Sequence, residues 1–235
     1  MNLASFRAPW WLPGGHAQSI WPALVSRNHS GASPHYVRER WDTPDGDFID
    51  VDIQAAPQID ARWLVMFHGL EGSSRSQYAE GFARVAQAAG LHFAVPHFRG
   101  CSGELNRAPR AYHSGDFEEI GWILERLRAR TAQPLLVAGI SLGGNALLRW
   151  AEESGQTATR TAQAVAAVCS PIDMAAGGQA IGRGFSRQTY TRMFLGTMKP
   201  RALAKLAQHP GLFERERLLA ARDLYEFDNV FTAPL

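Results

Sequence analysis

Regular patterning begins with two short segments in which apolar and polar positions alternate. Residues 36–41 and 48–53 are joined by a Pro-Asp-Gly run, which is typical of a turn. In the second segment, three aliphatic residues alternate with Asp50 and Asp52, so one face is predicted to be buried and the other exposed to solvent. The pattern predicts two antiparallel strands.

Four apolar runs follow, at residues 63–67, 91–95, 134–140 and 164–169, and segments with helical periodicity separate them. The first helix is expected to end at Gly90. Its apolar stripe is expected at Tyr78, Phe82, Val85, Ala86 and Ala89. The second begins with Asp116 as predicted N-cap and has Glu119 at capping-box spacing, and a third covers residues 145–153. Strands that alternate with helices predict a doubly wound, mostly parallel α/β sheet behind the antiparallel start.

The two ends of the chain do not follow this alternation. Residues 1–34 are rich in Trp, Pro and Gly, and we predict an irregular arm that is anchored by burial of Trp10, Trp11 and Trp21. Residues 174–235 show helical and loop patterns without a strand. We therefore expect a core over residues 1–173, arm included, and a helical cap over 174–235.

Composition is that of a globular protein, with 46% apolar and 20% charged residues among 235. The net charge of +2 gives no electrostatic case for nucleic-acid binding. Cys101 and Cys169 are the two cysteines, which excludes a disulfide scaffold and fits a reducing compartment. The first twenty residues lack the apolar stretch of a signal peptide, so a cytoplasmic location is predicted.

Charge is distributed unevenly, because residues 174–222 hold nine Lys or Arg and two acids, a net charge of +7. A helix predicted over 186–198 places Tyr190, Met193 and Phe194 on one side and Arg187 and Arg192 more to the other. This basic cap indicates either a lid that contacts anionic lipid at the membrane periphery or a solvated helix that packs on the sheet.

The strongest chemical pattern is G-x-S-x-G at residues 139–143, with Ser141 at its centre. It follows an apolar strand and opens a predicted helix, the context in which a sharp turn exposes a serine hydroxyl above the strand end. Side chains in place of Gly139 and Gly143 would collide across that turn. The alternative, an accidental tight turn, is less favoured because of this context.

A second pattern, His68-Gly69-Leu70, closes the run at 63–67. An oxyanion hole needs a backbone N–H group on such a turn, so we expect the donors to be Leu70 and, from the serine turn, Leu142. His68 is expected to be structural and not the catalytic base. The alternative is a plain turn at the end of a strand.

Four motifs together resemble the YheT-like branch of the α/β-hydrolase superfamily. They are PGGHAQSIWP at 13–22, HGLEGSSRSQY at 68–78, FRGCSGELNRAPRAYHSGD at 98–116 and GISLGGNALLRW at 139–150. The resemblance implies a serine esterase or lipase that acts on small ester or lipid substrates, with Ser141 as nucleophile and Leu70 and Leu142 as oxyanion donors. It also places the loop 99–107 at the site rim.

The same resemblance implies that the acid and the histidine of the triad lie after two further strands. The chain is therefore expected to be truncated, with six of the usual eight strands. Within it, Asp173 and His209 follow Ser141 in the right order as substitutes, although His209 is more simply a cation at a helix C-terminus. The apolar run at 164–169 would then be an unpaired edge, so self-association is predicted.

Other chemistries lack support. The sequence has no dinucleotide or phosphate-binding glycine motif and no metal-ligand spacing, so neither a cofactor nor a metal is expected. Cys101 is interpreted as a packing residue. The sequence thus favours a carboxylic-ester hydrolase that works through an acyl-enzyme. The alternative is a catalytically silent fragment or pseudoenzyme that serves as a binding module.

Overall fold

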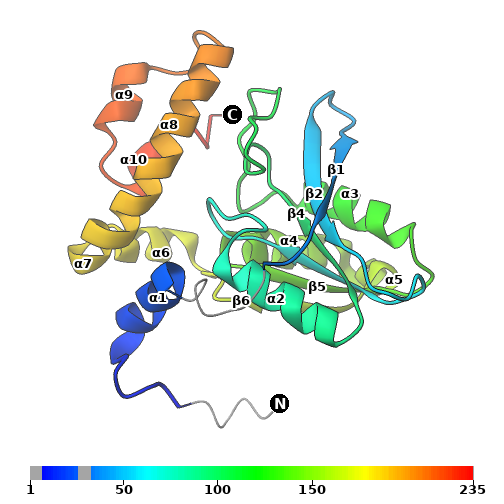
Figure 1. Ribbon diagram of the computed structural model, residues 1–235. Helices are drawn as coiled ribbons and strands as arrows, with labels where there is room; N and C mark the ends of the chain where they lie inside the picture. Colours follow the sequence, from blue (N-terminus) through cyan, green and yellow to red (C-terminus); the bar gives the residue numbers. More distant parts are fainter. Residues whose placement is uncertain (1–6, 26–32, 235) are drawn as a thin grey trace.

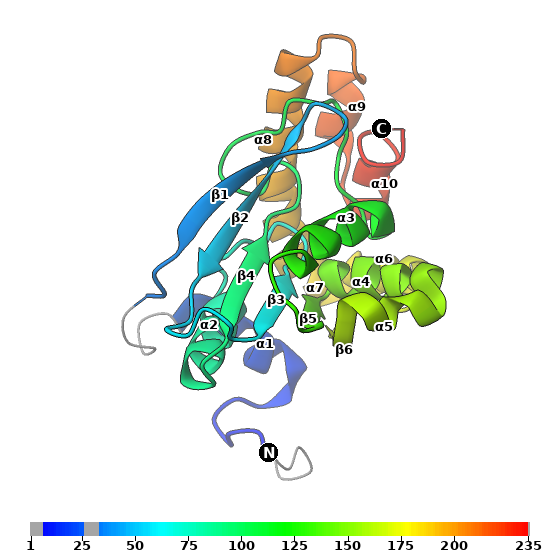
Figure 2. The same ribbon diagram turned by 90° about the vertical axis from the view of Figure 1, so that its right-hand side faces the viewer.

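The computed structural model describes residues 7–25 and 33–234 and is built on a six-stranded sheet (Figures 1 and 2). The strands are β1 (Val37–Asp42), β2 (Phe48–Gln54), β3 (Trp63–Phe67), β4 (His92–Pro96), β5 (Leu135–Ile140) and β6 (Ala162–Val168). Their order across the sheet is β1-β2-β4-β3-β5-β6. β2 pairs antiparallel with β1 and β4, whereas β4, β3, β5 and β6 are mutually parallel. The predicted antiparallel start and mostly parallel sheet are confirmed.

Both faces of the central strands are covered by helices, which explains their continuous apolar runs. In β3, Val65 and Phe67 share a core with α3 (Phe117–Arg128) and α4 (Leu142–Ser154), whereas Met66 packs with α2 (Gln77–Ala88). Figure 2 shows α2 on one side of the strands and α3 and α4 on the other. The short helices η3 (Gly155–Thr157) and α5 (Ala158–Thr161) lead from α4 into β6.

Two predicted details of the helices are wrong in part. Of the stripe predicted for α2, Ala86 is buried and Tyr78 and Phe82 pack against the core. Val85, at 65%, and Ala89 are exposed, since the helix presents the small side chains of Ala79, Ala83 and Ala86 to the sheet. The capping box of α3 is absent, because its two acids are bound elsewhere. Asp116 accepts a hydrogen bond from the His113 N–H and pairs with Arg110, and Glu119 pairs with Arg99.

The prediction that one face of β2 is exposed to solvent is also wrong. Asp50 and Asp52 are only 2% and 4% exposed. The register places Arg40 opposite Asp50 and Arg38 opposite Asp52, and each guanidinium binds its carboxylate through two nitrogens at 2.7 to 2.9 Å. Arg38 also donates to the carbonyl of Ser102, so a loop after β4 closes over this polar face.

The N-terminal segment differs from the irregular, buried arm that was predicted. Residues Gly14–Val25 form α1, and Trp10, Trp11 and Trp21 are 90%, 48% and 43% exposed. The rings of Trp11 and Trp21 contact each other edge to face, which covers part of their apolar surface without a place in the core. Residues 1–6 and 26–32 of the predicted arm lie outside the described residues.

The described part of residues 174–235 is helical without a strand, as predicted. It contains α6 (Met174–Ile181), α7 (Gly184–Ser186), η4 (Arg187–Thr191), α8 (Arg192–Gln208), α9 (Arg215–Ala220) and α10 (Leu224–Asp228). Figure 1 shows α8, α9 and α10 standing beside the sheet, and these helices share their own apolar cluster around Met198, Leu218 and Phe227. Among the described helices, none combines the length and the hydropathy that a bilayer crossing requires.

β6 is an edge strand of the described sheet. It pairs with β5, and its residues after Ala162 are exposed. The run was expected to be apolar on both faces, and the exposed side chains include Val165 and Val168, at 37% and 40%.

Candidate active site

Ser141 occupies a sharp turn between β5 and α4. Its backbone has φ 52° and ψ −119°, a conformation that residues with a side chain rarely adopt. The turn is fixed on both sides, since the Ser141 N–H donates to the Val168 carbonyl at 2.9 Å and the Ser141 carbonyl accepts from Gly144 and Asn145. The strand–turn–helix context that the sequence predicted is therefore present.

The glycines around Ser141 have no room for a side chain. A Cβ on Gly139 would lie 2.6 Å from the Gly143 oxygen and the Gly144 Cα, and a Cβ on Gly143 would overlap the His68 carbonyl oxygen. The serine turn and the end of β3 therefore pack backbone against backbone. Gly144 is equally constrained, by Ser170 after β6, and the sequence pattern did not reveal that requirement.

The loop after β3 leaves one backbone N–H free between two that are bound. The Gly69 N–H donates to the Tyr78 hydroxyl at 3.0 Å, and the Glu71 N–H donates to the Tyr112 hydroxyl at 2.9 Å. Within residues 7–25 and 33–234, the N–H groups of Leu70 and Leu142 donate no hydrogen bond. Both residues line the same cavity, an arrangement suited to stabilise a developing oxyanion.

His68 is fully buried and bonded at both ring nitrogens. Its Nε2 accepts from the Phe98 N–H at 3.1 Å, which requires the proton to be on Nδ1, and Nδ1 donates to the Gly69 carbonyl at 2.8 Å. Burial, together with the neighbouring His97, lowers the pKa of His68 to about 3. The imidazole is therefore neutral and holds the loop, in agreement with the structural role that we expected.

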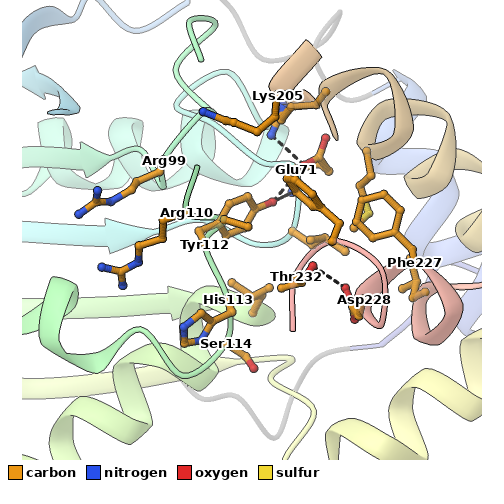
Figure 3. A pocket seen from close by; sticks show the side chains of 18 of the residues that line it. Glu71, Arg99, Arg110, Tyr112, His113, Ser114, Lys205, Phe227, Asp228 and Thr232 are labelled. Atoms are coloured by element: carbon orange, nitrogen blue, oxygen red, sulfur yellow. Dashed lines mark hydrogen bonds and ion pairs between the residues drawn. The ribbon is translucent and has the colours of Figure 1, made fainter. Parts of the chain in front are cut away.

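A cavity of about 150 Å³ lies between the sheet and the cap (Figure 3). Its apolar lining comes from the core, through Leu70, Leu105 and Leu142, and from the cap, through Met198, Phe227 and Phe231. Figure 3 shows Glu71 and Tyr112 close together at one side, with Phe227 and Asp228 on the cap side. The loop 99–107, expected at the site rim, contributes several lining residues. The cavity thus offers an apolar space lined by the two residues whose N–H groups are unused in the described chain.

Buried charges that the sequence did not reveal fix that loop. Asp47 accepts from Asn106 and from the N–H groups of Arg107 and Ala108, at 2.6 to 3.1 Å. Burial alone would raise the pKa of Asp47, but these hydrogen bonds outweigh it and the pKa is lowered. Arg99 joins Asp47 at 3.0 Å to Glu119 at 2.6 Å, so the loop rests on a buried ion-pair network.

The proposed substitutes for the acid and the base are not brought together. The Asp173 carboxylate caps α6 by accepting from the Ala176 N–H at 2.8 Å, and His209 Nε2 contacts the Arg107 carbonyl at 2.8 Å. In the part of the chain that the structure describes, no histidine is hydrogen-bonded to Ser141. Burial raises the pKa of the Cys101 thiol to about 11, as befits a packing residue. No group of three or more metal-ligating side chains gathers among the described residues.

Comparison with known proteins gives one family and several relatives. Residues 62–224 match the profile of the alpha/beta hydrolase fold. The Escherichia coli (strain K12) protein named Putative esterase YheT is 38% identical over 224 residues, which cover 93% of this chain and 64% of that protein. Phospholipase ABHD3 of Mus musculus is 24% identical over 210 residues, 84% of this chain and 50% of that protein. The chain thus spans about half to two thirds of these relatives.

Among solved structures, esterase Est22 is similar, with a TM-score of 0.49 and 17% identity over 69% of this chain and 55% of that chain. The alpha/beta hydrolase domain-containing protein 10 from mouse also has a TM-score of 0.49, with 14% identity over 67% of this chain and 58% of that chain.

Proposed function

Because the chain belongs to the alpha/beta hydrolase fold family, we propose that it hydrolyses carboxylic esters with Ser141 as the nucleophile. The observation that carries the proposal is the turn at Ser141, at φ 52°, beside a cavity lined by Leu70 and Leu142, whose N–H groups are unused within the described chain. Relatives named as an esterase and a phospholipase support an ester or lipid as substrate.

In this proposal, Ser141 Oγ attacks the ester carbonyl and the alcohol leaves. The negative charge that develops on the carbonyl oxygen is stabilised by the Leu70 and Leu142 N–H groups, and water then releases the acyl group from Ser141. The apolar cavity receives the acyl or alkyl chain. The attack requires a base that takes the serine proton and passes it to the leaving alcohol. Asp173 and His209 have the right order in the sequence for this role, but the structure binds them apart from each other, to the Ala176 N–H and the Arg107 carbonyl, so neither is assigned as acid or base.

A second candidate function is supported by the observation that no histidine among the described residues is hydrogen-bonded to Ser141. Loss of a triad member lowers the rate by about 10⁴-fold or more, so such a chain would bind an acyl ligand in the cavity without turnover. The cavity and the two N–H groups serve that function equally well.

A fluorophosphonate distinguishes the two functions, because it reacts with a serine only when that serine is activated. We expect intact mass measurement of the folded chain to show one adduct, and the Ser141→Ala variant to show none. A folded chain that acquires no adduct would rule out the nucleophile and leave the binding function.

We further propose that the cap contacts anionic lipid. Phe185 and Met193 are 54% and 55% exposed, and Arg187 and Arg192 line one groove without an ion-pair partner among the described residues. Exposed apolar side chains beside unpaired cations suit a negatively charged interface. We expect sedimentation with phosphatidylglycerol vesicles that high salt weakens, and none with phosphatidylcholine; an Arg187→Gln/Arg192→Gln variant that binds as the parent does would contradict this.

A further inference from the structure

Two tyrosine hydroxyls bind the backbone N–H groups on either side of the Leu70 N–H. Tyr78 comes from α2 and takes the Gly69 N–H, while Tyr112 comes from the loop before α3 and takes the Glu71 N–H. Burial raises the pKa of the Tyr112 hydroxyl well above its usual range, so the hydroxyl keeps its proton. It therefore accepts from the backbone of Glu71 and donates to Glu71 Oε1 at 3.1 Å.

The backbone of Glu71 has a conformation that is unfavourable for glutamate. Its φ is 58°, in the left-handed region, and a long side chain usually relaxes out of that region unless other contacts oppose it. Here the side chain is only 9% exposed and binds Tyr112 and Arg201 through the same carboxylate oxygen. The other oxygen, Oε2, is buried and has no partner in the described structure.

Arg201 provides the charge that allows this carboxylate to remain buried. Its Nη1 lies 2.8 Å from Glu71 Oε1 and 3.1 Å from the Cys101 sulfur. A buried carboxylate without its cation is strongly unfavourable. Glu71 Oε2 already has no partner, so without Arg201 the carboxylate would keep only its hydrogen bond from Tyr112. If Arg201 moved away, the Glu71 side chain would be expected to turn to solvent, and the left-handed backbone would lose its support.

Arg201 belongs to α8, in the cap, so this ion pair crosses from the cap to the loop after β3. A second link runs beside it, because the Leu70 side chain packs against the apolar cluster of the cap. Two consecutive residues of this loop, Leu70 and Glu71, are therefore both in contact with the cap.

We propose that Arg201 and Glu71 are positioning residues through which helix α8 controls the oxyanion loop, so that the Leu70 N–H faces Ser141 only while the cap is seated. The role of the Leu70 N–H as an oxyanion donor rests on the proposed function. The contact between helix α8 and the loop after β3 does not depend on it. A cap displaced from the core would leave Ser141 exposed and the oxyanion hole incomplete.

Hydrogen exchange followed by mass spectrometry tests the link in the full chain. In Arg201→Ala we expect the amides of residues 69–72 to exchange about tenfold faster or more, since the loop loses a charge-assisted contact. Arg201→Lys should restore part of the protection. Arg215→Ala is the matched control, because Arg215 also forms an ion pair in the cap, with Glu216 at 3.0 Å, and we expect no change at 69–72.

A paired variant keeps the test decisive if Arg201→Ala unfolds. In Glu71→Gln/Arg201→Met the buried charge is removed along with its partner, so exchange at 69–72 should be slower than in Arg201→Met alone. Equal exchange in these two variants, or unchanged exchange at 69–72 in a folded Arg201→Ala, would overturn the proposal.

The rate of fluorophosphonate labelling at Ser141 separates this inference from the proposed function. If the parent chain is labelled, Arg201→Ala should be labelled about tenfold more slowly or worse, because removal of one oxyanion donor costs at least that much. If the parent is not labelled, the proposed esterase fails and the exchange experiment still decides the link. If the parent is labelled and exchange does not respond, the link fails and the esterase stands.

Discussion

Replacement of Ser141 by glycine should stabilise the protein relative to replacement by alanine. Ser141 sits at φ 52° and ψ −119°, where a Cβ is unfavourable, and such a residue stores about 1–3 kcal/mol of strain. Alanine keeps the Cβ and therefore the strain, whereas glycine removes both. Glycine costs about 0.5–1 kcal/mol through the greater freedom of the unfolded chain, so the net advantage over alanine is about 0–2.5 kcal/mol.

Neither substitution disturbs much else at this position. Ser141 Oγ makes no hydrogen bond within the described chain, so loss of the hydroxyl is nearly neutral in both variants. The free energy of unfolding is measured by urea denaturation of the two variants side by side, with equal m-values as the check that the unfolded states are comparable. Both variants should resist fluorophosphonate.

Ser154 provides the matched control, because it is a serine near the end of the same helix with ordinary helical backbone angles, φ −73° and ψ −23°. There the order should reverse, with Ser154→Gly less stable than Ser154→Ala by about 0.5–1 kcal/mol. If Ser141→Gly were as unstable relative to Ser141→Ala as the pair at 154, the turn would not be strained and the reasoning would fail.

Three further predictions address the core and the sheet edge. Arg99→Met leaves Asp47 and Glu119 buried without their shared cation, and urea denaturation should show a loss of about 3–5 kcal/mol, whereas the exposed Arg107→Met should stay within about 0.5 kcal/mol. The pKa of His68 falls to about 3 in the folded state, below the ordinary value of about 6.5, so the unfolded chain binds the proton first and stability should fall with pH from about 6.5 toward 3, by up to about 1.4 kcal/mol per pH unit. His68→Gln should flatten that dependence; an equal slope would refute it. Val165→Lys on the edge strand β6 should shift sedimentation velocity profiles toward monomer, and identical profiles would contradict association through this edge.

The sheet was predictable because the residues of each strand indicate by themselves whether the strand is covered on one face or on both. Residues 63–67 read as a continuous apolar run, and β3 has those bounds, since a strand covered on both faces needs an apolar side chain at nearly every position. The serine turn was predictable in part for a similar reason, because Gly139 is required by a backbone contact with Gly143 and Gly144, a few residues away, whereas the contact that requires Gly143 is with the distant end of β3.

What the sequence did not reveal depends on contacts between distant segments. Asp50 and Asp52 were predicted to face solvent because their partners, Arg40 and Arg38, become neighbours only through the β1–β2 register. Likewise, nothing around Glu71 indicates a left-handed backbone, and its ion-pair partner, Arg201, lies 130 residues further along the chain. Buried charges with distant partners therefore limit how far such a site can be read from local patterns.

The distribution of backbone strain argues that the function lies at the carboxyl ends of the parallel strands. In the described chain, the residues other than glycine with positive φ are Glu71, Ser141 and Cys169, at 58°, 52° and 54°. Each lies just after a strand, namely β3, β5 and β6, and these strands are neighbours in the sheet. Strain of this kind persists only where surrounding contacts impose it, and ligands of open α/β sheets bind at this edge. A surface that served only for packing could use glycine at all three positions, so the retained side chains support the proposals that Ser141 acts directly and that Glu71 acts through the cap.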